Sequence, residues 1–102
     1  MLKDKVFIGR ICRIMHSDQP IEGRVLKVIR TEDYRIIGFE LVLQYAHSEH
    51  IHIFCKDEVL FQINQDWLNG SDLIIHLLEQ KMNALRREMK IRQPKKMKSI
   101  AS

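Results

Sequence analysis

The chain has 102 residues, enough for one domain with one modest hydrophobic core, and this length argues against a two-domain enzyme with an interdomain cleft. Hydrophobic residues make up 45% and charged residues 29%, as in ordinary soluble globular proteins, and no apolar run approaches the roughly 20 residues that span a bilayer. The net charge of +4 is uneven, because residues 1–70 carry nine Lys/Arg against ten Asp/Glu and residues 71–102 carry eight against three.

The first ten residues, MLKDKVFIGR, contain no sustained apolar segment. We therefore expect no signal peptide, a cytoplasmic location and no association with membranes. In a reducing compartment Cys12 and Cys55 should stay reduced and serve as small core hydrophobes.

Residues 5–63 are rich in Val, Ile, Leu and Phe, and turn-forming sequences such as HSDQP and AHSEH interrupt them at regular intervals. This pattern predicts antiparallel strands at about 5–15, 21–30, 35–46, 50–55 and 59–63. Five strands without intervening helices would leave two edges exposed, and closing them into a small barrel removes both edges. Gly9, Gly23 and Gly38 would allow the bends that closure needs.

The predicted fold class is mainly β with a C-terminal helix (α+β). We expect a five-stranded antiparallel small barrel in residues 1–70, one long amphipathic helix in residues 71–93, and a disordered basic tail in residues 94–102.

The stretches IEGRVLKVI, YRIIGFELVL and IHIFCKDEVLFQI resemble the Sm-like and SH3-like small β-barrels. In those folds an early strand carries a bending glycine, and a one-turn helix precedes the closing strand. The layout over residues 5–63 is also loosely similar to that of YolD-like bacterial proteins, which implies a bacterial or phage source. Since the chain lacks the Asp and Asn that mark the uridine pocket of Sm proteins, the resemblance implies a fold and a bias toward binding nucleic acid or protein, without implying a site.

The segment QYAHSEHIHIF, residues 44–54, holds three of the five histidines. If Tyr45 and Ile51 face the same core, they must lie opposite each other across a hairpin with an odd-numbered loop. That register places His50 and His52 together on the outer face of the sheet.

Two interpretations of this hairpin are open. It could form a His-x-His zinc or nickel site completed by His47 or Glu49, or it could be a solvated hairpin. A structural zinc site needs four ligands, whereas the strand supplies two, His50 and His52. We therefore expect no metal and no other cofactor, with His47, His50 and His52 as the only weak candidates.

Catalytic arrangements are absent from the sequence pattern. The Cys–His pairs that can be drawn lie on opposite strand faces or have no third group to orient them, and no glycine-rich nucleotide loop occurs. We expect a protein that is not an enzyme.

The segment NGSDLIIHLLEQKMNALRREMKIRQPKK predicts a helix over about 72–92, capped by Ser71 or Asp72 and ended by Pro94. Its first two turns are apolar over a wide arc, which is typical of a segment packed on a sheet. Trp67 and Leu68 precede it and should wedge between the barrel and the helix.

A narrower apolar stripe with a/d heptad spacing runs along this helix, and we call it the seam: Ile75, Leu78, Met82, Leu85 and Met89. The seam either packs on the chain's own barrel or joins two chains in a homodimer. In a parallel pair Lys81 would face Arg86 and repel it. In an antiparallel pair Lys81 meets Glu88 and Glu79 meets Arg86, so the charges favour the antiparallel arrangement.

The end of the chain is strongly basic, and its candidate phosphate-binding residues are Arg86, Arg87, Lys90, Arg92, Lys95, Lys96 and Lys98. These residues either contact nucleic-acid phosphates or only keep the chain soluble. No helix-turn-helix or interleaved aromatic pattern predicts the reading of bases.

Two functions from different classes fit these patterns. The first is a small regulatory or accessory protein that dimerises through the helix and contacts nucleic acid with its basic end. The alternative is an adaptor or inhibitor whose seam binds another protein, with metal sensing at the histidine hairpin a third hypothesis.

Overall fold

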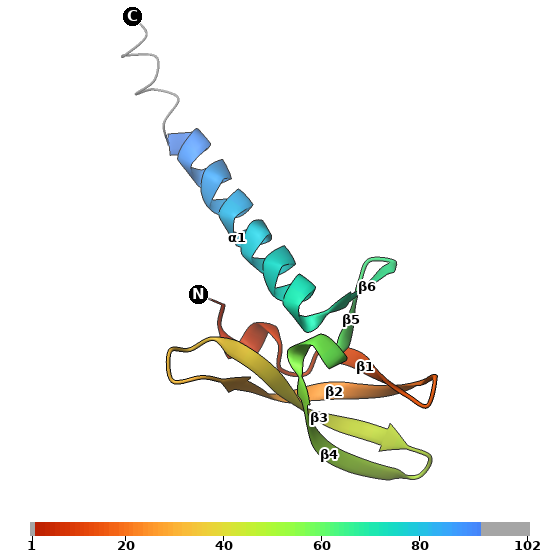
Figure 1. The fold of residues 1–102 in the computed structure, drawn as a ribbon. Coiled ribbons are helices and arrows are strands. Elements are labelled where there is room, and N and C mark those ends of the chain that lie inside the picture. The colour runs from red at the N-terminus through yellow and green to blue at the C-terminus, as the bar shows by residue number, and fades with distance from the viewer. Residues whose placement is uncertain (1, 93–102) are drawn as a thin grey trace, which may run out of the picture.

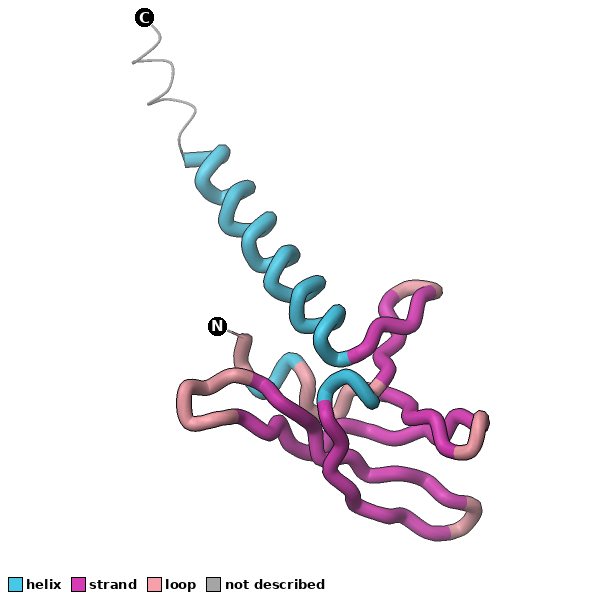
Figure 2. Tube along the Cα trace, in the orientation of Figure 1, coloured by secondary structure: helices cyan, strands magenta, loops and turns pink. Residues whose placement is uncertain are grey.

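The computed structural model describes residues 2–92 of the chain, with side chains to residue 89. In chain order it contains η1 (Asp4–Val6), β1 (Ile11–His16), β2 (Gln19–Arg30), β3 (Ile36–Tyr45), β4 (Ser48–Cys55), η2 (Lys56–Glu58), β5 (Leu60–Ile63), β6 (Asp66–Asn69) and α1 (Gly70–Arg92). The protein is therefore mainly β with a C-terminal helix (Figure 2). The predicted tail, residues 94–102, lies outside the described residues.

The strands form one antiparallel sheet in the order β4-β3-β2-β1-β5-β6, and this sheet is open (Figure 1). The prediction of a closed five-stranded barrel is therefore wrong. Closure would require β5 to pair with β4, but β5 already pairs with β1 on one edge and with β6 on the other. A strand has only two edges, so the sixth strand, which the sequence pattern does not predict, prevents closure.

The core lies on one face of the sheet, which we call the inner face. Phe39 is fully buried, with its ring centroid 5.4 Å from that of Phe7 and 5.3 Å from that of Phe61. Leu41 and Leu43 continue the same face along β3 and are also fully buried. Val42 points to the opposite, outer face and is half-buried, as the alternation in this strand predicts.

The N-terminal segment differs from its prediction. Residues expected to begin the first strand form η1 instead, and β1 begins only at Ile11. Gly9 lies in the turn between them with φ of 79°, a backbone conformation that glycine adopts without steric cost.

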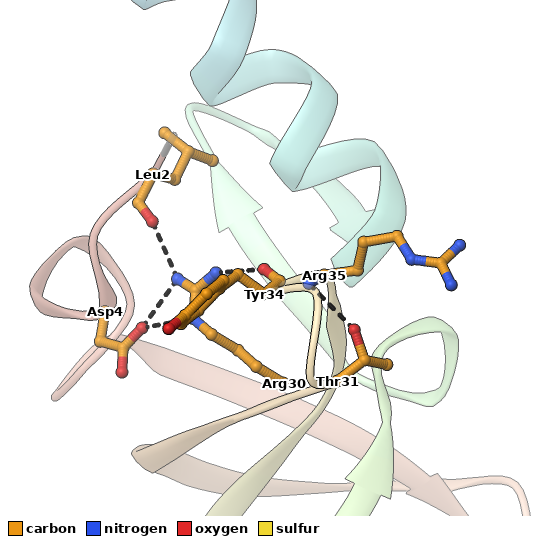
Figure 3. Close-up of polar contacts among 6 residues, drawn as sticks. All are labelled: Leu2, Asp4, Arg30, Thr31, Tyr34 and Arg35. Atoms are coloured by element: carbon orange, nitrogen blue, oxygen red, sulfur yellow. Dashed lines mark hydrogen bonds and ion pairs between the residues drawn. The ribbon is translucent and has the colours of Figure 1, made fainter.

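Arg30, near the end of β2, holds this segment in place (Figure 3). Its guanidinium forms an ion pair with Asp4 at 2.7 Å and donates hydrogen bonds to the carbonyl oxygens of Leu2 and Tyr34, each at 2.8 Å. The chain start and the β2–β3 turn are thereby fixed to each other.

Helix α1 begins beside η2. A Cβ on Gly70 would collide with the carbonyl oxygen of Lys56, so glycine permits this close approach. The side-chain oxygen of Asn69 accepts the backbone N–H of Asp72 at 2.9 Å, which makes Asn69 the N-terminal cap. The sequence predicts Ser71 or Asp72 as the cap, but Ser71 donates its hydroxyl to Asp57 instead.

Within residues 2–92, no helix combines the length and the apolar character needed to cross a membrane.

Candidate functional site

The first two turns of α1 attach the helix to the sheet. Leu73 is fully buried in the core, and Ile74 and Leu77 pack partly buried against it. These three side chains fix the direction in which the rest of the helix leaves the body. Figure 1 shows α1 projecting away from the sheet over most of its length.

Every residue of the predicted seam is exposed. The exposed fractions are 54% for Ile75, 39% for Leu78, 51% for Met82, 53% for Leu85 and 54% for Met89. The interpretation in which the seam packs on the chain's own barrel is therefore wrong beyond Leu78, because the helix has left the sheet by that point. The structure places the five side chains on one continuous helix, as the heptad spacing predicts.

The charged residues beside the seam are also on the surface. Glu79, Arg86 and Glu88 are exposed, and they occupy the positions that flank an a/d stripe. Each of these three charged side chains could therefore contact a second helix that packs on the seam.

Of the candidate phosphate-binding residues, Arg86 and Arg87 are exposed on the last turns of α1. Lys90 and Arg92 belong to the helical segment by their backbone. The other three, Lys95, Lys96 and Lys98, lie outside the described residues.

The histidine hairpin has a different register from the predicted one. Tyr45 pairs with Ser48, so the turn consists of the two residues Ala46 and His47, and Leu43 lies opposite His50. Ala46 adopts φ of 45°, the positive value that a tight hairpin turn requires. The inner face of β4 is therefore formed by His50, His52 and Phe54, whereas Ile51 and Ile53 point outward and are 58% and 63% exposed.

The reason for this difference lies in the position of β4. As the last strand of an open sheet it is exposed on both faces, so burial does not decide which of its alternating residues faces inward. The histidines instead pack along an aromatic row. The His50 ring centroid lies 5.1 Å from that of Tyr45 and 6.2 Å from that of His52, and His52 lies 6.3 Å from Phe54.

For metal binding, the structure brings His50 and His52 together on one face and leaves His47 in the turn. Ser48 shares a 3.0 Å hydrogen bond with the Nε2 atom of His50. Glu49 belongs to the other face of the strand. Among residues 2–92 no three His, Cys, Asp or Glu side chains are grouped so that they could hold a metal ion.

The two thiols lie in different environments. Cys12 is fully buried in the core, and burial raises the pKa of its thiol to about 12. Cys55 is exposed, contrary to the prediction that it faces the core, because the register shift moves it to the outer face. The hydrogen bond and the negative charge of the Glu58 carboxylate raise the pKa of the Cys55 thiol.

Trp67 belongs to the unpredicted strand β6. The guanidinium carbon of Arg13 lies 3.6 Å from the centroid of its ring, which is a cation–π contact. This pair fastens β6 to β1 on the outer face of the sheet. The contact between Arg13 and Trp67 forms only because β6 pairs with β5, and no pattern in the sequence predicts that pairing.

Comparisons with protein families, with curated proteins and with solved structures found no match to this chain.

Proposed function

We propose that this chain is a non-enzymatic binding protein that associates with a second copy of itself through the seam of α1. The observation that carries the proposal is the exposure of all five seam side chains on a helix that projects from the sheet.

The stability of the projecting helix supports this proposal. From Glu79 onward, each described side chain of α1 is exposed, so the sheet does not stabilise this part of the helix. Isolated helices shorter than about 12–15 residues are marginal in water, and most helices in proteins depend on the packing of an apolar face. A second helix on the seam would supply that packing.

The apolar area of the seam determines how strongly two chains should associate. Removing the remaining exposed half of a Leu or Met side chain from water contributes about 1 kcal/mol. Four such side chains from each chain, Leu78, Met82, Leu85 and Met89, therefore contribute about 8 kcal/mol in a dimer. This gain is of the same order as the roughly 4–15 kcal/mol lost on association. We therefore expect the contact between the two helices to dissociate on dilution.

The flanking charges favour an antiparallel pair. A register that sets Met82 opposite Leu85 of the second chain, and Leu78 opposite Met89 of the second chain, keeps apolar residues together along the seam. It also brings Glu79 toward Arg86 of the second chain, where the two charges attract.

Leu85→Asp tests the proposal, because a carboxylate at the centre of the seam cannot be desolvated at low cost. We expect the variant to keep the fold, since Leu85 is exposed in the single chain, and to form smaller particles than the wild-type chain in light scattering. Arg87→Asp, a charge change on the side of the helix away from the seam, is the control and should leave the mass unchanged. An equal mass for Leu85→Asp and the wild-type chain would contradict pairing through the seam.

We propose nucleic-acid phosphates as the ligand of the basic end of α1. The exposed pair Arg86 and Arg87 supports this function, and such contacts release counterions and weaken steeply with salt. The binding of a fluorescent random-sequence duplex, measured at two salt concentrations, should weaken at the higher salt and on changing both arginines to Gln.

An adaptor would instead bind its protein partner equally at both salt concentrations and lose it when Leu85 or Met89 is made polar.

A further inference from the structure

The open sheet leaves β4 with a free edge. In the strand order β4 has β3 as its only neighbour, and Figure 1 shows it at the end of the sheet remote from α1. The other edge strand, β6, has four residues and leads directly into α1, whereas β4 has eight. Between Glu49 and Ile53, the backbone N–H and C=O groups along the outer side of β4 are therefore available to another strand.

This edge lacks most of the features that protect edge strands in soluble proteins. Such edges are usually short, bulged or interrupted by Lys or Pro. The segment Ser48–Cys55 contains no Lys, Arg or Pro, and its pairing with β3 runs from Tyr45/Ser48 to Gly38/Cys55 without a bulge. Two β-branched apolar side chains, Ile51 and Ile53, stand exposed on its outer face.

The hairpin register identifies which backbone groups are free. In a two-residue hairpin the pair next to the turn, Tyr45 and Ser48, is hydrogen-bonded, and hydrogen-bonded pairs then alternate along the strands. Ser48, His50, His52 and Phe54 therefore direct their backbone groups toward β3. The intervening residues Glu49, Ile51 and Ile53 direct theirs outward, and these groups are free. Cys55 also points outward, but its backbone N–H donates to the carboxylate of Glu58 at 3.3 Å.

We propose that β4 pairs antiparallel with β4 of a second copy of this chain, joining the two sheets into one. Two identical strands related by a two-fold axis normal to the sheet pair only in registers that keep each residue on its own face. The register centred on His52 sets Ile51 of each chain opposite Ile53 of the other, and His50 opposite Phe54.

The side chains of β4 are compatible with pairing to β4 of a second chain. The only acid of the strand, Glu49, falls opposite Cys55 of the second chain, so no carboxylate faces another. His52 falls opposite His52 of the second chain. Apolar side chains meet apolar ones on the outer face, and aromatic side chains meet on the inner face.

This surface is separate from the α1 seam, so its test uses the full chain carrying Leu85→Asp. At pH 8 this chain should scatter light as a particle of about 24 kDa, twice the chain mass of 12.2 kDa. Adding Ile51→Lys places a lysine on the free edge and should halve that mass. The matched control is Met15→Lys, since Met15 is 55% exposed against 58% for Ile51 and lies on β1, and it should leave the mass at about 24 kDa.

A mass of about 12 kDa for the Leu85→Asp chain at the highest attainable concentration would overturn the β4 pairing without affecting the proposal for α1. An Ile51→Lys variant that keeps the larger mass would overturn it as well.

A disulfide provides the second measurement. In the register centred on His52 the two His52 residues form a non-hydrogen-bonded pair, whose Cα atoms approach to about 4.5 Å, within the range that a disulfide spans. His52→Cys, in a chain that also carries Cys55→Ser, should give a covalent dimer on oxidation. Continued monomeric migration of the oxidised chain in gel electrophoresis without reductant would exclude this register.

Discussion

At the scale of single residues, strand β3 separates buried side chains from half-exposed ones. Leu41 is fully buried on the inner face beside the phenylalanine cluster, whereas Val42 faces outward beside Ile51. Side chains alternate between the two faces of a strand, so these two residues lie on opposite faces. Leu41 is the buried one because the core covers the inner face of β3.

Leu41→Ala should lower the free energy of unfolding by about 2–5 kcal/mol, since it removes buried methyl groups and leaves a cavity. Val42→Ala should cost about 1 kcal/mol or less, because solvent reaches this side chain already. Urea unfolding at one fixed protein concentration compares the two variants. Equal losses for both would mean that the outer face of β3 is covered in solution.

The two thiols give a second prediction at this scale, because only the thiolate reacts readily with alkylating reagents. Cys12 is buried with its pKa raised to about 12, so at pH 8 the folded chain should take up one equivalent of iodoacetamide, at Cys55. The unfolded chain should take up two, as mass spectrometry would show. Glu58→Gln removes the negative charge that helps to raise the pKa of Cys55, and should therefore speed its reaction at pH 8. A folded chain that is modified at Cys12 would contradict the buried assignment.

At the scale of elements, the long elements follow directly from the sequence. The helix predicted over residues 71–93 occupies Gly70–Arg92, and the strand predicted over 35–46 occupies Ile36–Tyr45. Both have strong periodic patterns, with turn or capping residues at their ends. The short strand β6 was missed because its four residues, DWLN, have no alternation of their own and are defined only by pairing with β5.

The register of β4 could not be predicted for a related reason. The alternation of Ile and His in residues 50–53 shows that two faces differ, but it does not say which face meets the core. The prediction of a closed barrel and the prediction of the β4 register are wrong for the same reason. A closed barrel would have buried the isoleucines of β4, whereas an open sheet leaves them exposed. In the candidate site the heptad spacing of the seam was visible in the sequence, whereas its exposure depended on where α1 leaves the sheet.

The charges beside the seam give the prediction that belongs to α1. In the antiparallel pair, Glu79→Lys turns two attractive contacts with Arg86 into repulsive ones, a change of about 2 kcal/mol per dimer or roughly 30-fold in the dissociation constant. Adding Arg86→Glu should restore the affinity by exchanging the signs. In a parallel pair Glu79 would face Ile74, and the single change would have little effect. Sedimentation equilibrium of the two variants distinguishes these cases.

At the scale of the whole molecule, the structure presents two surfaces at opposite ends. The seam of α1 extends away from the sheet, and the free edge of β4 lies on the side remote from the helix (Figure 1). Each surface is suited to a two-fold pair. A chain that uses two different two-fold contacts assembles beyond a dimer. The wild-type chain should therefore form larger particles than a chain in which either contact is blocked.

A distance between spin labels tests the antiparallel pairing of α1 with α1 of a second chain. Labels at Asn83→Cys and, separately, at Lys90→Cys are placed in a chain with Cys55→Ser, in which Cys12 stays buried. In the proposed register the midpoint lies between residues 83 and 84, so the Asn83 labels should lie almost level along the helix axis. The Lys90 labels should be displaced by about 20 Å along it, at 1.5 Å per residue. Equal distances for both positions would show a parallel pair, and the absence of any dipolar coupling between chains would contradict pairing through α1.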